Sequence, residues 1–158
     1  MARFLVFTLL LVTQLAFSQA AGFQFIENKN QWPSQVAYKA DLRSGYLYLE
    51  KNGFLYNLYD AHAVNKYVKN HFSKETNFHK KELGWHSFRV SFLNCNSDVK
   101  ILGKQQTKAY YNYFLGNNPN NWGEKAYGFH KISYQNIYNG IDLNYYSQLL
   151  NLKYDFIV

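Results

Sequence analysis

Short runs in which apolar and polar residues alternate limit the possible folds of this chain more than any other feature. The runs are separated by Asn, Gly and Ser, and they occupy residues 23–27, 36–42, 46–59, 85–92, 99–102, 109–115 and 142–157. A period of two residues places neighbouring side chains on opposite faces and predicts antiparallel β-strands. With no long helical period beside them, we expect one all-β domain, an antiparallel β-sandwich of about ten strands.

The run at 46–59 predicts a hairpin around Asn52-Gly53, because both residues tolerate the positive φ of a type I′ turn. A two-residue loop there pairs Lys51 with Phe54 and Leu49 with Tyr56. One face of this hairpin is then apolar and belongs to the core, with Leu47, Leu49, Phe54, Tyr56 and Leu58. The other face is partly exposed to solvent and rich in tyrosine, with Tyr46, Tyr48, Glu50, Leu55, Asn57 and Tyr59.

The run at 142–157 predicts a second hairpin, in which a loop over 148–151 pairs Ser147 with Leu152. Its apolar face carries Leu143, Tyr145, Leu152, Tyr154 and Phe156, and its polar face carries Asp142, Asn144, Lys153 and Asp155. A sheet with one wet side needs this division. In the run at 85–92 the same alternation predicts one buried side, with His86, Phe88, Val90 and Phe92.

Residues 60–84 interrupt the alternation with a polar segment, for which we expect a long loop with a short helix near 61–70. Its lysines contribute much of the formal net charge of +7. They come without arginines, and a solvated surface explains them better than a nucleic-acid partner. Weak attraction to an anionic polysaccharide is the alternative.

The first 20 residues have the pattern of a secretion signal. One positive charge precedes the uncharged stretch Phe4–Phe17, and small residues stand at Ser18 and Ala20. This stretch is shorter than the about 20 residues of a membrane-spanning helix. We expect Sec export, cleavage after Ala20, a secreted or cell-surface protein and no later transmembrane segment. Residues 21–158 then form a single domain, whose one cysteine, Cys95, makes no internal disulfide.

No motif of a known catalytic or metal site is present, so we expect no enzyme, no cofactor and no metal. The five histidines lack zinc-site spacing, and Asn94–Asp98 offers oxygen ligands with only one charge. Asp142 and Asp155 are diagonal neighbours in the second hairpin, and paired carboxylates are the machinery of glycoside hydrolases. A surface charge ladder with Lys153 is the simpler interpretation.

The aromatic content is high for a core alone, with 15 Tyr and 3 Trp. Tyrosine suits half-exposed faces, because its ring is apolar and its hydroxyl is polar. Such a face can stack on sugar rings or pack against a neighbouring domain. Alternatively, tyrosine is frequent here only because it has a high propensity for β-strands. The candidate ligand-binding residues are Trp32, Tyr46, Tyr48, Tyr59 and Trp122.

Five blocks of sequence resemble a known family, the uncharacterised amino-terminal domain of large secreted Bacteroidetes proteins. The blocks are 25–33, 49–54, 111–117 followed by Trp122, 134–143 and 152–158. Asn30 stands where the family usually has Gly, and Asn also tolerates a left-handed turn.

The resemblance implies a place ahead of SBBP-type propeller repeats, adhesive modules and a gliding-motility (type IX) sorting domain. It also implies a domain truncated at its carboxy-terminal end, because the family continues with further strands. We therefore expect an exported, non-catalytic module with a structural or adhesive role, whose partners are neighbouring domains of a longer polypeptide or cell-surface polysaccharide. The alternatives are a carbohydrate-binding module and, less favoured, a glycoside hydrolase.

Overall fold

The computed structural model describes residues 22–72, 84–149 and 151–158 and forms an antiparallel β-fold. The expected secretion signal and the segment 73–83 lie outside these residues. The strands are β1 (Phe25–Glu27), β2 (Val36–Leu42), β3 (Gly45–Glu50), β4 (Gly53–Tyr59), β5 (Trp85–Ser91), β6 (Lys100–Tyr113), β7 (Gly123–Tyr138), β8 (Ile141–Gln148) and β9 (Asn151–Ile157). One helix, α1 (Ala61–Phe72), and a 3₁₀ turn, Pro119–Asn121, complete the elements.

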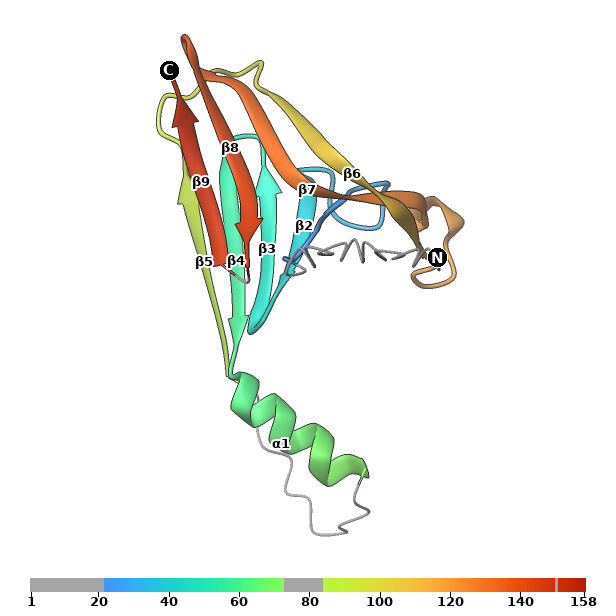
Figure 1. The fold of residues 1–158 in the computed structure, drawn as a ribbon. Coiled ribbons are helices and arrows are strands. Elements are labelled where there is room, and N and C mark those ends of the chain that lie inside the picture. The colour runs from blue at the N-terminus through green and yellow to red at the C-terminus, as the bar shows by residue number, and fades with distance from the viewer. Residues whose placement is uncertain (1–21, 73–83, 150) are drawn as a thin grey trace, which may run out of the picture.

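All nine strands belong to one antiparallel sheet that curls into a half-barrel (Figure 1). Eight follow the order β5-β4-β3-β2-β1-β7-β8-β9, and β6 pairs with β7 outside this order. The expected all-β antiparallel class is confirmed, but a sandwich of two separate sheets is not.

The strands form one sheet because of β7, a strand of 16 residues whose bounds the sequence did not predict. It pairs with β1 at Gly128 and Phe129, with β8 from Lys131 onward, and with β6 along most of its length. Hydrogen bonding therefore continues from one half of the fold to the other.

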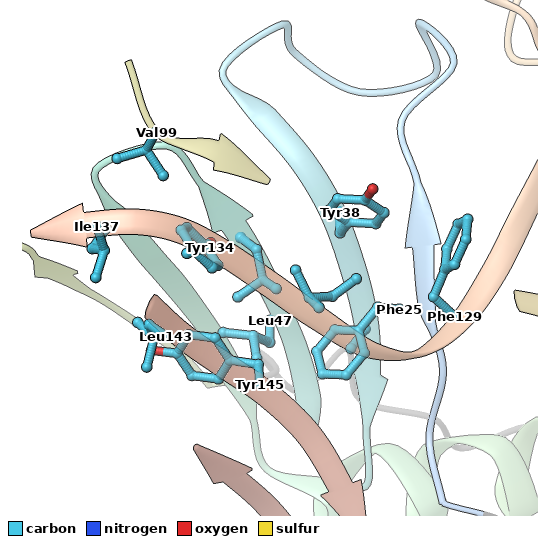
Figure 2. Close-up of a cluster of buried hydrophobic side chains, with 12 residues drawn as sticks. Phe25, Tyr38, Leu47, Val99, Phe129, Tyr134, Ile137, Leu143 and Tyr145 are labelled. Carbon is cyan, nitrogen blue, oxygen red and sulfur yellow. The ribbon is translucent and has the colours of Figure 1, made fainter. Parts of the chain in front are cut away.

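The core fills the concave side of the curled sheet (Figure 2). Side chains from β3, β7 and β8 meet there, and Leu47, Tyr134 and Leu143 are completely buried. The Phe54 ring of β4 lies 5.6 Å from the Tyr145 ring of β8, so the two ends of the sheet pack across the hollow. Burial of these side chains is the main force that holds the curl closed.

The first hairpin has the expected faces but a different turn. The pairs are Glu50 with Gly53, Leu49 with Phe54 and Leu47 with Tyr56, so each residue of β3 lies opposite a residue two positions before its predicted partner. The shift keeps every side chain on its predicted face. Neither Asn52 nor Gly53 has a positive φ, so no type I′ turn forms. Gly53 is needed for space instead, since an ideal Cβ there would lie 2.1 Å from the Val90 carbonyl oxygen of β5.

The second hairpin has the predicted register, with Ser147 opposite Leu152 and Asn144 opposite Asp155. The two short strands expected at 99–102 and 109–115 are one strand, β6, with register shifts between Gln106 and Tyr110 and between Tyr111 and Tyr113. A bulge thus lies where the broken pattern suggested a loop. The expected buried side is wrong for His86, Phe88 and Val90, because every residue of the outermost strand β5 is exposed. Phe92, which follows β5, does pack against the core.

The helix expected near 61–70 is present as α1, and its first turn is capped by Asp60, whose carboxylate accepts the backbone N–H of His62 and Ala63. Within the described part of the chain, no helix has the length and apolar character to cross a membrane.

Candidate functional site: an outer aromatic strip

Three of the expected ligand-binding residues meet on the convex face of the hairpin β3–β4. Tyr46, Tyr48 and Tyr59 point away from the core that Leu47 and Leu49 enter. The Tyr46 ring centroid lies 6.4 Å from that of Tyr48 and 6.1 Å from that of Tyr59. These separations are typical of interacting aromatic pairs, so the rings form one cluster.

Trp85, which the sequence analysis did not include among the candidates, extends this cluster onto β5. It is opposite Tyr59 in the β4–β5 ladder, and their ring centroids are 5.3 Å apart. It also lies 6.4 Å from Tyr46, with the two ring planes only 21° from parallel. With 56% of its surface exposed, Trp85 is the most accessible ring of the cluster.

Lys39 of β2 links the cluster to Trp32. Its Nζ lies 4.0 Å from the Tyr46 ring centroid and 5.6 Å from the Trp32 ring centroid, which are cation–π distances. Asp41 holds the same ammonium in an ion pair of 2.7 Å. Burial raises the pKa of Tyr48, and the charge of Lys39 opposes part of that rise.

A tight turn fixes Trp32. The Asn28 carboxamide donates to the carbonyls of Trp32 and Val36 at 3.0 and 2.8 Å, and its Oδ1 accepts the Trp32 N–H at 3.2 Å. Asn30 has a φ of 78°, which confirms the left-handed turn expected there. The Trp32 ring then packs edge-on against Tyr113 of β6 at 5.4 Å, where burial raises the pKa of the Tyr113 hydroxyl.

These contacts define an aromatic strip that crosses the outer face of the sheet. Its members are Tyr113, Trp32, Tyr46, Tyr48, Tyr59 and Trp85. Five of the six rings are half-buried and Trp85 is exposed, so the strip offers ring faces and hydroxyl groups to solvent. Such a surface can stack on the apolar face of a ligand and hydrogen-bond its edge.

Trp122 lies apart from this strip. Its ring packs edge-on against Phe114 at 5.3 Å, and its indole Nε1 donates to the Gly116 carbonyl at 3.2 Å. Both contacts stay within the loop between β6 and β7. The structure therefore brings together four of the five candidate residues and separates Trp122 from them.

The two candidate catalytic carboxylates have structural partners. The Asp142 carboxylate accepts the backbone N–H of Asn136 at 2.7 Å, at a bulge of β7. The exposed Asp155 carboxylate accepts a hydrogen bond from the Tyr146 hydroxyl, and this raises the pKa of Tyr146. A hydrolase needs both carboxylates in one concave pocket, and the solvent exposure of Asp155 counts against that function.

A depression of about 830 Å³ lies beside the loop that joins β5 to β6. Its polar wall includes Gln35, Asn52 and Asn96, and its floor includes Phe92 and the half-buried Cys95. Among the described residues, no three His, Cys, Asp or Glu side chains come close enough to hold a metal ion. Its charged lining residues already have structural partners, since Glu50 binds Arg89 and the Lys51 ammonium donates to the Ser97 carbonyl at 3.5 Å. The aromatic strip is therefore the better candidate site.

Comparison with protein families gives a match over most of the chain. The model of a family described as a domain of unknown function, DUF7948, covers residues 25–158, which include every strand of the fold. Comparisons with curated proteins and with solved structures find no match.

Proposed function

Because the chain belongs to the DUF7948 family, which carries no assigned activity, we propose a function from its surface: an exported, non-catalytic β-module with an adhesive or structural role at the cell surface. The aromatic strip is its contact surface. The partner is a cell-surface polysaccharide or a neighbouring domain of a longer polypeptide of the Bacteroidetes, gliding-motility type. Export by the Sec route through residues 1–20 places the module outside the cell.

One observation carries the proposal. Rings from five separate segments converge on the convex face, although the core lies on the concave face and needs none of them. An exposed tryptophan beside half-buried tyrosines is the composition that binding surfaces favour, because such rings bury much area at little entropic cost.

The adhesive role is tested by retention of the fluorescently labelled chain on intact cells of the producing organism, measured by flow cytometry. Two aromatic contacts contribute about 1–3 kcal/mol together, so the double variant Tyr46→Ser/Trp85→Ser should lose about tenfold or more in retention. Tyr110→Ser removes an exposed ring of β6 outside the strip and should keep wild-type retention. Equal retention of all three proteins would contradict the proposal.

A carbohydrate-binding module is the second candidate, favoured by one pair of rings. Tyr46 and Trp85 are nearly parallel, at 21°, and next to them Ser87 donates to the Asn57 carboxamide oxygen at 2.6 Å. A sugar ring needs this combination of flat apolar surface and polar groups at its edge.

Affinity electrophoresis in gels that contain a soluble β-glucan, xylan or mannan separates the two candidates. For a carbohydrate-binding module, one of these polymers retards the wild-type chain, Trp85→Ala abolishes the retardation, and Trp122→Ala leaves it unchanged. If no polymer retards the chain while cells still retain it, binding to these three polymers is excluded and the adhesive role remains with a partner specific to the cell surface.

The proposed export has its own test. Expression of the full chain in a Gram-negative host should release a product that begins at Ala21, as read from its intact mass. A cell-associated product that keeps residues 1–20 would contradict export by cleavage.

A further inference from the structure

β9 is an edge strand of the sheet that the described residues form. Among the described residues it pairs with β8 alone, so every second residue of β9 directs its backbone N–H and C=O away from the sheet. Its apolar face is also open, with Tyr154 59% and Phe156 49% exposed. An edge of this kind is a template for another strand.

The sequence of β9 is complementary to itself about Tyr154. Lys153 and Asp155 flank this residue on the polar face, and Leu152 and Phe156 flank them on the apolar face. We propose that β9 pairs with β9 of a second copy of this chain, antiparallel and centred on Tyr154. Lys153 then lies opposite Asp155 of the other copy, twice, and Leu152 lies opposite Phe156, twice.

Symmetry leaves few other registers. An antiparallel pair of identical strands is related by a two-fold axis perpendicular to the sheet, so the pairing is centred on one residue and keeps each face on its own side. Centring on Lys153 places two lysines opposite each other, and centring on Asp155 places two aspartates opposite each other. Like charges directly opposite are destabilising in a sheet. Centring on Leu152 or Phe156 places neither Lys153 nor Asp155 opposite a residue of the other charge.

The charges of β9 are available for this role. Neither Lys153 nor Asp155 takes part in an ion pair within the described part of the chain. The hydrogen bond from Tyr146 leaves acceptor positions on the Asp155 carboxylate. A second copy satisfies the free backbone groups, both charges and part of the apolar face at once. Since about seven residues of each copy pair, the interface is small and the dimer dissociates on dilution.

Charge exchange tests the pairing, with sedimentation velocity of the chain over a range of concentrations as the measurement. Lys153→Asp or Asp155→Lys alone places two like-charged pairs in the interface and should raise the dissociation constant about tenfold or more. The double exchange Lys153→Asp/Asp155→Lys restores opposite charges and should return dimerisation to near the wild-type level. Lys100→Asp and Asp98→Lys, at exposed positions outside β9, are the matched controls and should behave as the wild type.

A cross-linking experiment covers the case in which a charge variant does not fold. In a Cys95→Ala background, Tyr154→Cys lies opposite itself and should form a disulfide-linked dimer under mild oxidation. Phe156→Cys lies opposite Leu152 and should cross-link far less. A wild-type chain that stays monomeric, a double exchange that does not restore the dimer, or equal cross-linking at the two positions would overturn the proposal.

Discussion

At the scale of single residues, tyrosine serves the two faces of the sheet in different ways. On the concave side Tyr134 is completely buried, and its hydroxyl donates to the Glu50 carbonyl at 2.9 Å. On the convex side Tyr46 and Tyr59 keep part of their rings in solvent. Sequence alone places Tyr46 and Tyr48 on the outer face correctly, because they alternate with Leu47 and Leu49, whose apolar side chains favour the core.

The buried tyrosines predict a loss of stability at alkaline pH. Burial raises the pKa of Tyr134 well above its ordinary value of 10.0, and it raises the pKa of Tyr145 as well. The folded state therefore holds these protons more tightly than the unfolded state. The stabilisation is fully present below pH 10 and is lost as the pH rises from there toward the folded-state pKa values. Urea unfolding at a series of pH values should show this decline.

Tyr134→Phe separates the two effects of the Tyr134 hydroxyl on stability, its hydrogen bond to the Glu50 carbonyl and its titration at alkaline pH. At neutral pH the variant should lose about 1 kcal/mol of unfolding free energy, since the Glu50 carbonyl loses its donor. Above pH 10 its unfolding free energy should fall less steeply than that of the wild type, because one buried titrating group is gone. Tyr110→Phe, at an exposed position, is the control and should change neither quantity. A parallel decline of wild type and Tyr134→Phe would contradict this account.

Trp85 shows what sequence reasoning misses at the residue scale. It begins a strand whose partner, β4, lies on the other side of the 60–84 segment. No local pattern indicates that β4 pairs with β5 so that Trp85 lies opposite Tyr59, because this contact is made between distant parts of the chain. The only available signal is that a large aromatic residue opens a run of alternating residues.

At the scale of elements, the hairpin β3–β4 depends on Gly53. Gly53→Ala places a methyl group against the Val90 backbone and should cost about 2 kcal/mol or more of unfolding free energy. Gly84→Ala is the matched control, because a Cβ at Gly84 meets nothing within 4 Å. That variant should be neutral or slightly stabilising, since alanine restricts the unfolded chain. Thermal denaturation of both variants checks this, and equal melting temperatures would contradict the role of Gly53.

An ion pair also ties β5 to the sheet. Arg89 of β5 binds the Glu50 carboxylate of β3, whose side chain is only 4% exposed. Arg89→Met leaves that carboxylate buried without its cation and should cost about 1–2 kcal/mol, less than for a fully buried pair because Arg89 is half-exposed.

Lys29→Met is the control for that experiment. It breaks the more exposed ion pair with Glu27 and should cost at most about 0.5 kcal/mol. Chemical denaturation measures both variants, and amide exchange should show that the added opening in Arg89→Met is confined to β5. Equal effects of the two variants would show that burial of Glu50 is unimportant.

Strands with clean alternation are predictable from sequence, and bulged strands are not. The register of β8–β9 agrees with the expectation, because turn residues and alternation both specify it. In β6, Gln105 has a φ of 56°, and in β7, Lys125 has a φ of 51°. No composition rule indicates a left-handed conformation at these residues, so a bulge inside a long strand resembles a loop.

At the scale of the whole molecule, the fold class follows from local patterns, whereas the curl of the sheet does not. The curl requires that β1 and β8 follow one another along β7, a pairing of segments far apart in sequence. The same curl separates a concave core from a convex face that is free to make contacts. Four of the five candidate residues are found together on that face, because three share one hairpin and Lys39 links Trp32 to them.

Hydroxyl-radical footprinting tests the central claim, that the aromatic strip is the contact surface, most directly. The chain is oxidised with and without cell-envelope fragments of the producing organism, and mass spectrometry gives the oxidation rate of each aromatic residue. We predict that the fragments lower the rates of Tyr46, Tyr59 and Trp85 several-fold and leave those of Tyr110 and Phe114 unchanged. Unchanged rates along the strip, with protection of other aromatic residues instead, would contradict it.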